Sequence, residues 1–115
     1  MREARSGSIA ILYPAGHLCQ PESVSDLEAT LNRLLADGCQ QVIINMADVL
    51  HMNSTGLGAI MTAHIRYSKQ PNHRLALCAL TPHLENIFVI TKLALVIDLY
   101  PSEESALASF AQPPM

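Results

Sequence analysis

The chain has 115 residues, a length that fits one domain with one hydrophobic core. Half of the residues are hydrophobic and only 4% are aromatic, so the core is expected to be aliphatic. The formal net charge of -3 gives no basic surface for nucleic acid. No apolar run approaches the roughly 20 residues of a membrane-spanning helix, so membrane insertion is not expected.

The spacing of cysteines and histidines argues against the common disulfide and metal arrangements. The five histidines show no metal-ligand spacing, and the three cysteines include no Cys-x-x-Cys pair. The N-terminal segment is polar and mixed in charge, unlike a secretion signal. We therefore expect a cytoplasmic protein without metal or other cofactor, with reduced and buried thiols. The cysteines are Cys19, Cys39 and Cys78.

The first third of the chain predicts two strands and an amphipathic helix. Residues 8–13 form an apolar run typical of a strand, and residues 16–19 predict a short second strand. A helix should begin at Pro21, with Ser23 or Ser25 as its cap. Its apolar positions recur at spacings of three and four, at Leu27, Leu31, Leu34 and Leu35.

The last third predicts two further pairs of strand and helix. Residues 74–80 and 95–100 read as strands, each followed by helix-start residues. Alternating strands and helices indicate an α/β domain around a largely parallel sheet. We expect one domain over residues 1–115, with a core at about 8–110 and flexible tails at 1–7 and 112–115.

The central stretch carries the residues with the clearest functional pattern. Residues 42–46 predict a buried strand, and Asn53, Ser54 and Thr55 are helix-capping residue types. A helix should run from about Thr55 to Ser68. Its inward face is expected to hold Leu57, Ile60, Met61 and Ile65.

The start of this helix permits two interpretations. The hydroxyls of Ser54 and Thr55 either cap the helix or present a group that an anion or a phosphoryl group can join. Gly56 and Gly58 permit either tight packing against the sheet or close approach of a partner. His51 lies just before this segment, where it is expected to be exposed.

Residues 43–58, I-I-N-M-A-D-V-L-H-M-N-S-T-G-L-G, resemble the signature of the STAS domain of anti-sigma factor antagonists. The usual form there is an apolar strand, Asp-Leu-Ser-x-Val, an apolar pair, and Asp-Ser-Ser/Thr-Gly-Leu-Gly. The likeness covers nearly the whole chain, roughly residues 8–110. It includes a Gly-x-Leu after the first strand (16–18), a Pro-started helix (81–82) and a Thr-x-Leu (91–93).

The resemblance implies a fold and a function. The fold is a single STAS-like α/β domain with a four- to five-stranded, mixed but largely parallel sheet and about four helices. Family members bind a serine-kinase anti-sigma factor and so free a sigma factor to join RNA polymerase. The kinase phosphorylates the first serine of the motif, Ser54 here, which breaks the complex, and a phosphatase reverses the step. The implied partner surface comprises Asn53, Ser54, Thr55, Gly56, Gly58, Ala59 and Thr62.

Three positions depart from the family pattern, because Asn45, Asn53 and Cys19 stand where aspartates are usual. Fewer negative charges near Ser54 make a phosphate easier to hold, but they also remove contacts that a kinase reads. The same edge therefore also suits an adaptor subunit of a transport ATPase or of a signalling scaffold, without a phosphate cycle. An enzyme is disfavoured, because Ser54 lies in no Gly-x-Ser-x-Gly elbow and no phosphate-binding Gly-x-x-x-x-Gly-Lys loop is present.

Overall fold

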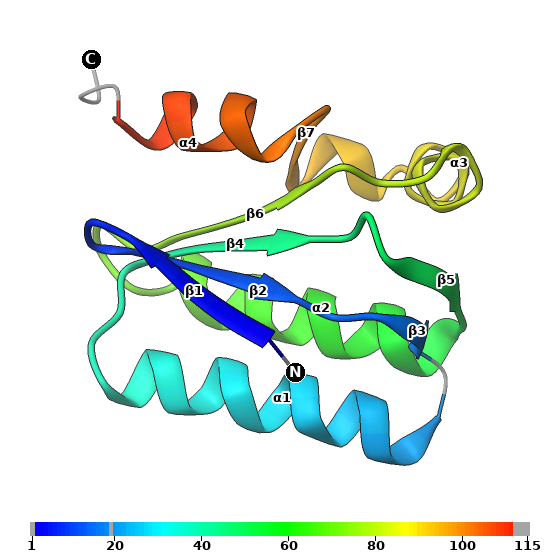
Figure 1. Ribbon diagram of the computed structural model, residues 1–115, viewed down its shortest axis with the longest axis horizontal. Coiled ribbons are helices and arrows are strands. Elements are labelled where there is room, and N and C mark those ends of the chain that lie inside the picture. Colours follow the sequence, from blue (N-terminus) through cyan, green and yellow to red (C-terminus); the bar gives the residue numbers. More distant parts are fainter. Residues whose placement is uncertain (1, 19, 112–115) are drawn as a thin grey trace.

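The computed structural model describes residues 2–18 and 20–111, which contain seven strands, four α-helices and one short 3-10 helix (Figure 1). The strands are β1 (Arg2–Ser6), β2 (Ile9–Tyr13), β3 (Gly16–Leu18), β4 (Gln41–Asn45), β5 (Val49–Met52), β6 (Arg74–Cys78) and β7 (Asp98–Tyr100). The helices are α1 (Pro21–Ala36), α2 (Ser54–Ser68), α3 (Pro82–Ile90), the 3-10 helix η1 (Leu93–Leu95) and α4 (Glu103–Ala111).

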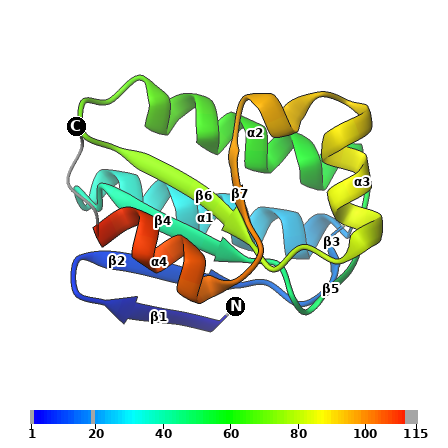
Figure 2. The same ribbon diagram turned by 90° about the horizontal axis from the view of Figure 1, so that it is seen from above.

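A mixed sheet of five strands divides the molecule into layers. Its order is β1-β2-β4-β6-β7, with β1 antiparallel to β2 and all other neighbours parallel. Helices α1 and α2 cover one face and α4 covers the other (Figures 1 and 2). The predicted α/β architecture, with its largely parallel sheet and four helices, is confirmed.

The central strands β2, β4 and β6 are largely apolar because both faces of the sheet are covered there. In β2, Ala10 and Leu12 belong to the core beneath α1 and α2, whereas Ile11 belongs to the core beneath α4. The same alternation separates Ile44 from Ile43 in β4. Two hydrophobic layers therefore form from one sheet, as the two-residue period of a strand requires.

The expected N-terminal tail is wrong for Arg2–Ser6, which forms β1. This edge strand pairs with β2 from Arg2 opposite Tyr13 to Ser6 opposite Ile9. Gly7 takes a positive φ of 62° in the tight link between the two strands, a conformation that glycine adopts readily. The strand lacks an apolar pattern because it is mostly exposed, so no sequence pattern predicted it. The expected tail at 112–115 lies outside the described residues.

The expected caps of α1 are also wrong. The N-cap is Gln20, whose side chain makes no capping hydrogen bond, and the helix begins at Pro21. Proline needs no partner for an N–H and its φ suits the first helical turn, so a side-chain cap at Ser23 or Ser25 is unnecessary. The buried face consists of Val24, Leu27, Leu31 and Leu34, with Leu35 at its margin.

The last strand is shorter than expected. Lys92 takes a left-handed φ of 63°, and η1 follows where the strand was predicted to start. The strand then covers only Asp98–Tyr100, beside β6. Leu95 is 84% exposed and Val96 is 58% exposed, so the apolar composition of residues 95–100 did not indicate burial there.

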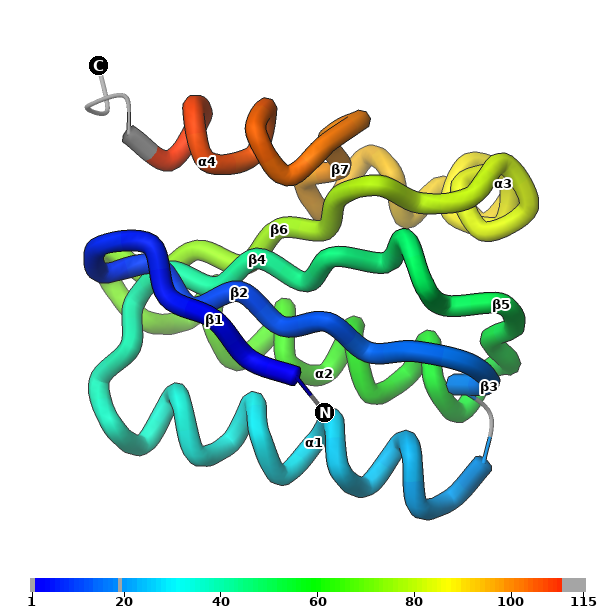
Figure 3. The backbone as a smooth tube through the Cα atoms, viewed as in Figure 1, coloured from blue at the N-terminus to red at the C-terminus, as the bar shows by residue number. Residues whose placement is uncertain are grey.

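A second, two-stranded sheet positions the start of α2. Strand β3 follows β2, β5 follows β4, and the two short strands pair in parallel. Gly16 N–H donates to the carbonyl of Asp48 at 2.8 Å, which ties their beginnings together. The tube in Figure 3 shows both strands continuing beyond the carboxyl ends of β2 and β4, toward α2. The sequence suggested β3 but not β5.

The N-terminal turn of α2 packs on this small sheet through Gly56. A Cβ atom at Gly56 would lie 2.2 Å from the carbonyl oxygen of Leu18 and 3.0 Å from the Met52 side chain. At Gly58 a Cβ atom would meet nothing within 4 Å. Close packing is therefore the reason for glycine at position 56, and it does not apply at position 58.

This contrast predicts opposite effects of the same substitution. Gly56→Ala should lower the free energy of unfolding by about 1–3 kcal/mol, because the new methyl group overlaps a backbone oxygen. Gly58→Ala is the matched control and should raise it by up to about 1 kcal/mol, because alanine favours an exposed helical position. Urea denaturation measures both. An unchanged midpoint for Gly56→Ala would show that α2 is free to shift away from β3.

Tyr67 is the one buried side chain of the described residues whose polar atom has no hydrogen-bond partner. It is 1% exposed, and burial raises the pKa of its hydroxyl. The hydroxyl of Tyr13, in contrast, donates to Glu103 Oε1 at 2.7 Å and so links β2 to α4.

Removing the hydroxyl should therefore change the free energy of unfolding differently at the two tyrosines. Tyr67→Phe should leave the free energy of unfolding unchanged or raise it by about 1 kcal/mol, because no hydrogen bond is lost. Tyr13→Phe should lower it by about 0.5–1.5 kcal/mol. Thermal and urea denaturation provide the comparison. A clear loss of stability in Tyr67→Phe would mean that its hydroxyl is hydrogen-bonded in solution.

Candidate functional site

Asn53 caps α2 and leaves the neighbouring hydroxyls free. Its side-chain Oδ1 accepts hydrogen bonds from the N–H groups of Thr55 and Gly56, each at 3.1 Å. Its backbone carbonyl accepts the Leu57 N–H at 3.0 Å. Among the described residues, none hydrogen-bonds to the hydroxyl of Ser54 or Thr55. The capping interpretation of these two hydroxyls is therefore wrong: Asn53 is the cap, and Ser54 is the first helical residue.

Part of the expected partner surface lies on one exposed stripe of α2. Ser54, Gly58 and Thr62 are four residues apart, so they share one side of the helix, and all three are exposed. Asn53 and Thr55 are exposed at the start of the same helix. We call these five residues, Asn53, Ser54, Thr55, Gly58 and Thr62, the α2 stripe.

Gly56 and Ala59 do not belong to this surface, which corrects the expectation for both. Gly56 is buried against β3, and Ala59 is 8% exposed. Ala59 lines a narrow groove between α1 and α2, together with Leu31 and Asn32 of α1. The small side chains at positions 56 and 59 therefore allow α2 to pack within the molecule.

The buried face of α2 is rotated from the expected one because its small residues, and not only its large apolar ones, pack within the molecule. Its buried residues are Gly56, Ala59, Ile60, Ala63 and Tyr67, while Leu57 and Met61 are half-buried and Ile65 is 49% exposed. Helix α2 contacts α1 as well as the sheet. The sequence pattern indicated only where large apolar side chains recur, and it could not predict that small residues lie beneath a neighbouring helix.

The electrostatic surroundings of Ser54 are neutral at the helix start. The first turn of α2 contains no acidic side chain. The N-terminus of a helix carries a partial positive charge and favours a bound anion. An exposed hydroxyl at this position can therefore accept a negatively charged group without harm to the helix.

Asn45 is the last residue of β4, and its side chain faces α4. Its Nδ2 donates to Glu103 Oε1 of α4 at 3.2 Å, and its Oδ1 accepts the Ala47 N–H at 3.0 Å. Helix α4 and helix α2 lie on opposite faces of the sheet (Figure 1). Glu103 also accepts the Tyr13 hydroxyl, and this hydrogen bond raises the pKa of Tyr13. Cys19, the third departure from the motif, lies outside the described residues.

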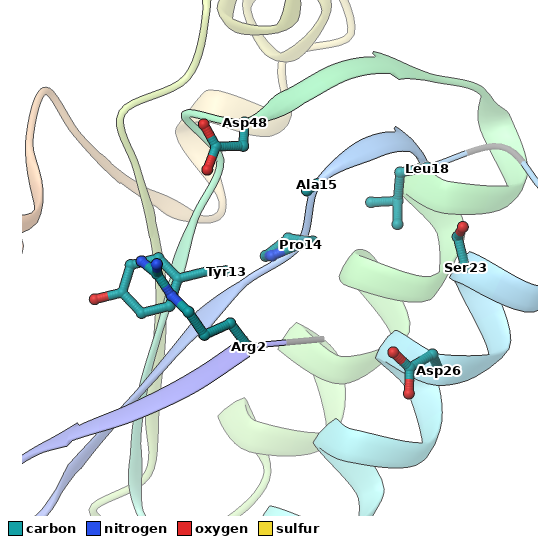
Figure 4. A pocket seen from close by; sticks show the side chains of 8 residues that line it. All are labelled: Arg2, Tyr13, Pro14, Ala15, Leu18, Ser23, Asp26 and Asp48. Atoms are coloured by element: carbon teal, nitrogen blue, oxygen red, sulfur yellow. The ribbon is translucent and has the colours of Figure 1, made fainter.

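A cavity of about 400 Å³ opens beside the junction of β2 and β3, separate from the α2 stripe (Figure 4). Its wall includes Arg2, Tyr13, Asp26 and Asp48. The Arg2 guanidinium lies 4.2 Å from the centre of the Tyr13 ring, a cation–π contact that already engages this charge. None of the residues that line the cavity belongs to the α2 stripe.

The described cysteines lie outside the α2 stripe. Cys39 and Cys78 are free and buried, and burial raises the pKa of Cys78 to about 11, so its thiol is unreactive near neutral pH. None of the helices in the described ranges is long and apolar enough to cross a membrane.

Comparison with known proteins places the chain in a family. The family model of the STAS domain matches residues 4–106. BtrV of Bordetella bronchiseptica, described as a candidate anti-sigma factor antagonist, is 26% identical over 88 residues, which are 76% of this chain and 75% of that protein.

Two solved structures have the same fold. An anti-sigma factor antagonist from Mycobacterium paratuberculosis superposes with a TM-score of 0.84 at 19% identity, covering 96% of this chain and 92% of that one. The phosphorylated form of the Bacillus cell fate determinant SpoIIAA gives a TM-score of 0.73 at 17% identity, covering 94% and 96%. The signature around Ser54, the mixed sheet and the match over residues 4–106 agree, and the chain belongs to the STAS domain family.

Proposed function

We propose that this protein is an anti-sigma factor antagonist that docks on its partner through the α2 stripe. Docking would release the sigma factor that the anti-sigma factor holds. The observation that carries the proposal is the free, exposed hydroxyl of Ser54 at the start of a helix that Asn53 already caps. The described relatives and structural neighbours of this kind support it.

The shape of the α2 stripe suits a protein surface rather than a small molecule. Gly58 has open space around the position of a Cβ atom, so a partner can approach the helix backbone closely there. Exposed hydroxyls at Ser54 and Thr62 flank this glycine on the same side of the helix. A partner side chain packed over Gly58 would thus meet polar groups that need hydrogen bonds in a dry interface.

Phosphorylation of Ser54 would then act as the switch. A phosphate adds about 1.5–2 negative charges at neutral pH. The free protein tolerates this charge, because it lies at the positive end of α2 and Asn53 contributes no opposing carboxylate. In a packed interface the same charge would remain without a partner and would cost several kcal/mol. One modification therefore separates the complex and leaves the monomer folded.

The enzyme for this step is proposed to be the anti-sigma factor itself, acting as a serine kinase, with a phosphatase to reverse it. SpoIIAA, a structural neighbour of this chain, is known in a phosphorylated form, which supports a phosphate cycle within the fold. A cytoplasmic location follows from this partnership, because sigma factors act on RNA polymerase.

The switch predicts that charge at Ser54 abolishes docking without loss of structure. Isothermal titration calorimetry of Ser54→Asp with a purified serine-kinase anti-sigma factor should show at least a hundredfold weaker binding than wild type. Circular dichroism should be unchanged, and the free energy of unfolding should rise by about 0.3–1 kcal/mol, because Asp is favourable at a helix N-terminus.

Ser68→Asp is the matched control, since it places the same charge on the same helix about 21 Å away. This variant should bind like wild type, although an acidic residue at a helix C-terminus lowers stability slightly. Equal affinity for wild type and Ser54→Asp would refute the switch.

A second prediction concerns the modification itself. Incubation with the partner kinase and ATP should add one phosphate to the wild-type protein and none to Ser54→Ala, as intact-protein mass spectrometry measures. Thr55→Ala, one residue further on, should still be phosphorylated. Tight docking without any phosphate transfer would instead favour an adaptor that uses the same surface without a phosphate cycle.

A further inference from the structure

Two histidines from distant parts of the sequence meet on the small sheet that leads into α2. His17 of β3 and His51 of β5 are direct partners in the parallel pairing. Their rings stack with centroids 4.9 Å apart and planes 20° from parallel. Both side chains are exposed, so their stacking is not imposed by burial in the core.

The ring nitrogens of this pair are available to a ligand. Within residues 2–18 and 20–111, no hydrogen bond or ion pair engages either imidazole. His73 is different, because its Nδ1 lies 3.0 Å from the Pro71 carbonyl and its ring contacts Tyr67. The stacked pair therefore presents two adjacent imidazoles whose nitrogens form no hydrogen bond or ion pair with the described residues.

We propose that His17 and His51 together bind a divalent transition-metal ion such as Zn²⁺ or Ni²⁺. Imidazole is the commonest protein ligand for metals of this class. A Zn–N bond is about 2.0–2.1 Å long, so a tetrahedral ion holds its two nitrogens about 3.4 Å apart. The ring centroids are 4.9 Å apart. Because an imidazole nitrogen binds a metal in the plane of its ring, both exposed side chains would have to turn about χ1 and χ2 to aim a nitrogen at the same ion.

The pair supplies two ligands and leaves the other positions open. Among the described residues, no group of three or more His, Cys, Asp or Glu side chains is arranged to hold a metal ion. Water or a donor atom from another molecule would complete the coordination, as at metal sites that exchange ligands. The expectation of no metal rested on sequence spacing, which cannot detect two residues paired only through strands.

The position of the site connects it to the proposed function. His51 precedes Ser54 by three residues, so their Cα atoms lie at most about 11 Å apart. A bound dication would place positive charge beside the α2 stripe. This connection rests on the proposed docking role, whereas metal binding by the pair does not.

Titration calorimetry with ZnCl₂ alone, on the full chain, tests the proposal. Wild type should bind one ion, and His17→Gln and His51→Gln should each bind at least tenfold more weakly. His83→Gln, which removes an exposed histidine of α3, is the matched control and should bind like wild type. Circular dichroism of each variant verifies the fold.

Imidazole resonances provide a second readout that needs no variant. Addition of Zn²⁺ should shift the ring signals of two of the five histidines, and assignment through the variants should identify them as His17 and His51. The proposal fails if wild type binds no ion, if only one of the two variants loses binding, or if His83→Gln weakens binding equally. Because no partner protein is present, these outcomes are independent of the docking experiments.

Discussion

The contact of Gly56 with the Leu18 carbonyl fixes the position of the candidate site. A methyl group would not fit there, so α2 can begin this close to β3 only with glycine at that position. The contact seats the first turn of α2 on the small sheet and directs Ser54 outward. The parallel pairing of β3 with β5 completes the support, because β5 leads directly into the Asn53 cap. A rigid base and an exposed hydroxyl thus arise from the same packing.

At the start of α2, capping the helix and presenting a free hydroxyl are done by two neighbouring residues. Asn53 satisfies two backbone N–H groups that would otherwise lack partners, and it does so without a charge. Ser54 is therefore not needed to stabilise the helix, so a change in its chemistry has little effect on folding. This separation is what a reversible switch requires, since the modified and unmodified states must both remain folded.

Two departures from the family motif have separate physical explanations. Asn45 carries an amide because it must donate a hydrogen bond to Glu103, which also accepts one from Tyr13. An aspartate there would place two carboxylates in contact. Asn53, on the other side of the sheet, keeps the capping geometry of an aspartate but not its charge. The first substitution fastens α4 to the sheet, and the second alters the surroundings of Ser54.

The sequence by itself determined the α/β fold, the strand and helix alternation and the place of Ser54 at a helix start, because these depend on local periodicity and capping chemistry. It could not reveal β1, whose exposed residues lack an apolar pattern, or the burial of Ala59 beneath α1. It also could not bring His17 to His51, 34 positions away along the printed sequence. Only the tertiary structure decided these features, because each arises from contact between segments whose separation along the chain carries no periodic signal.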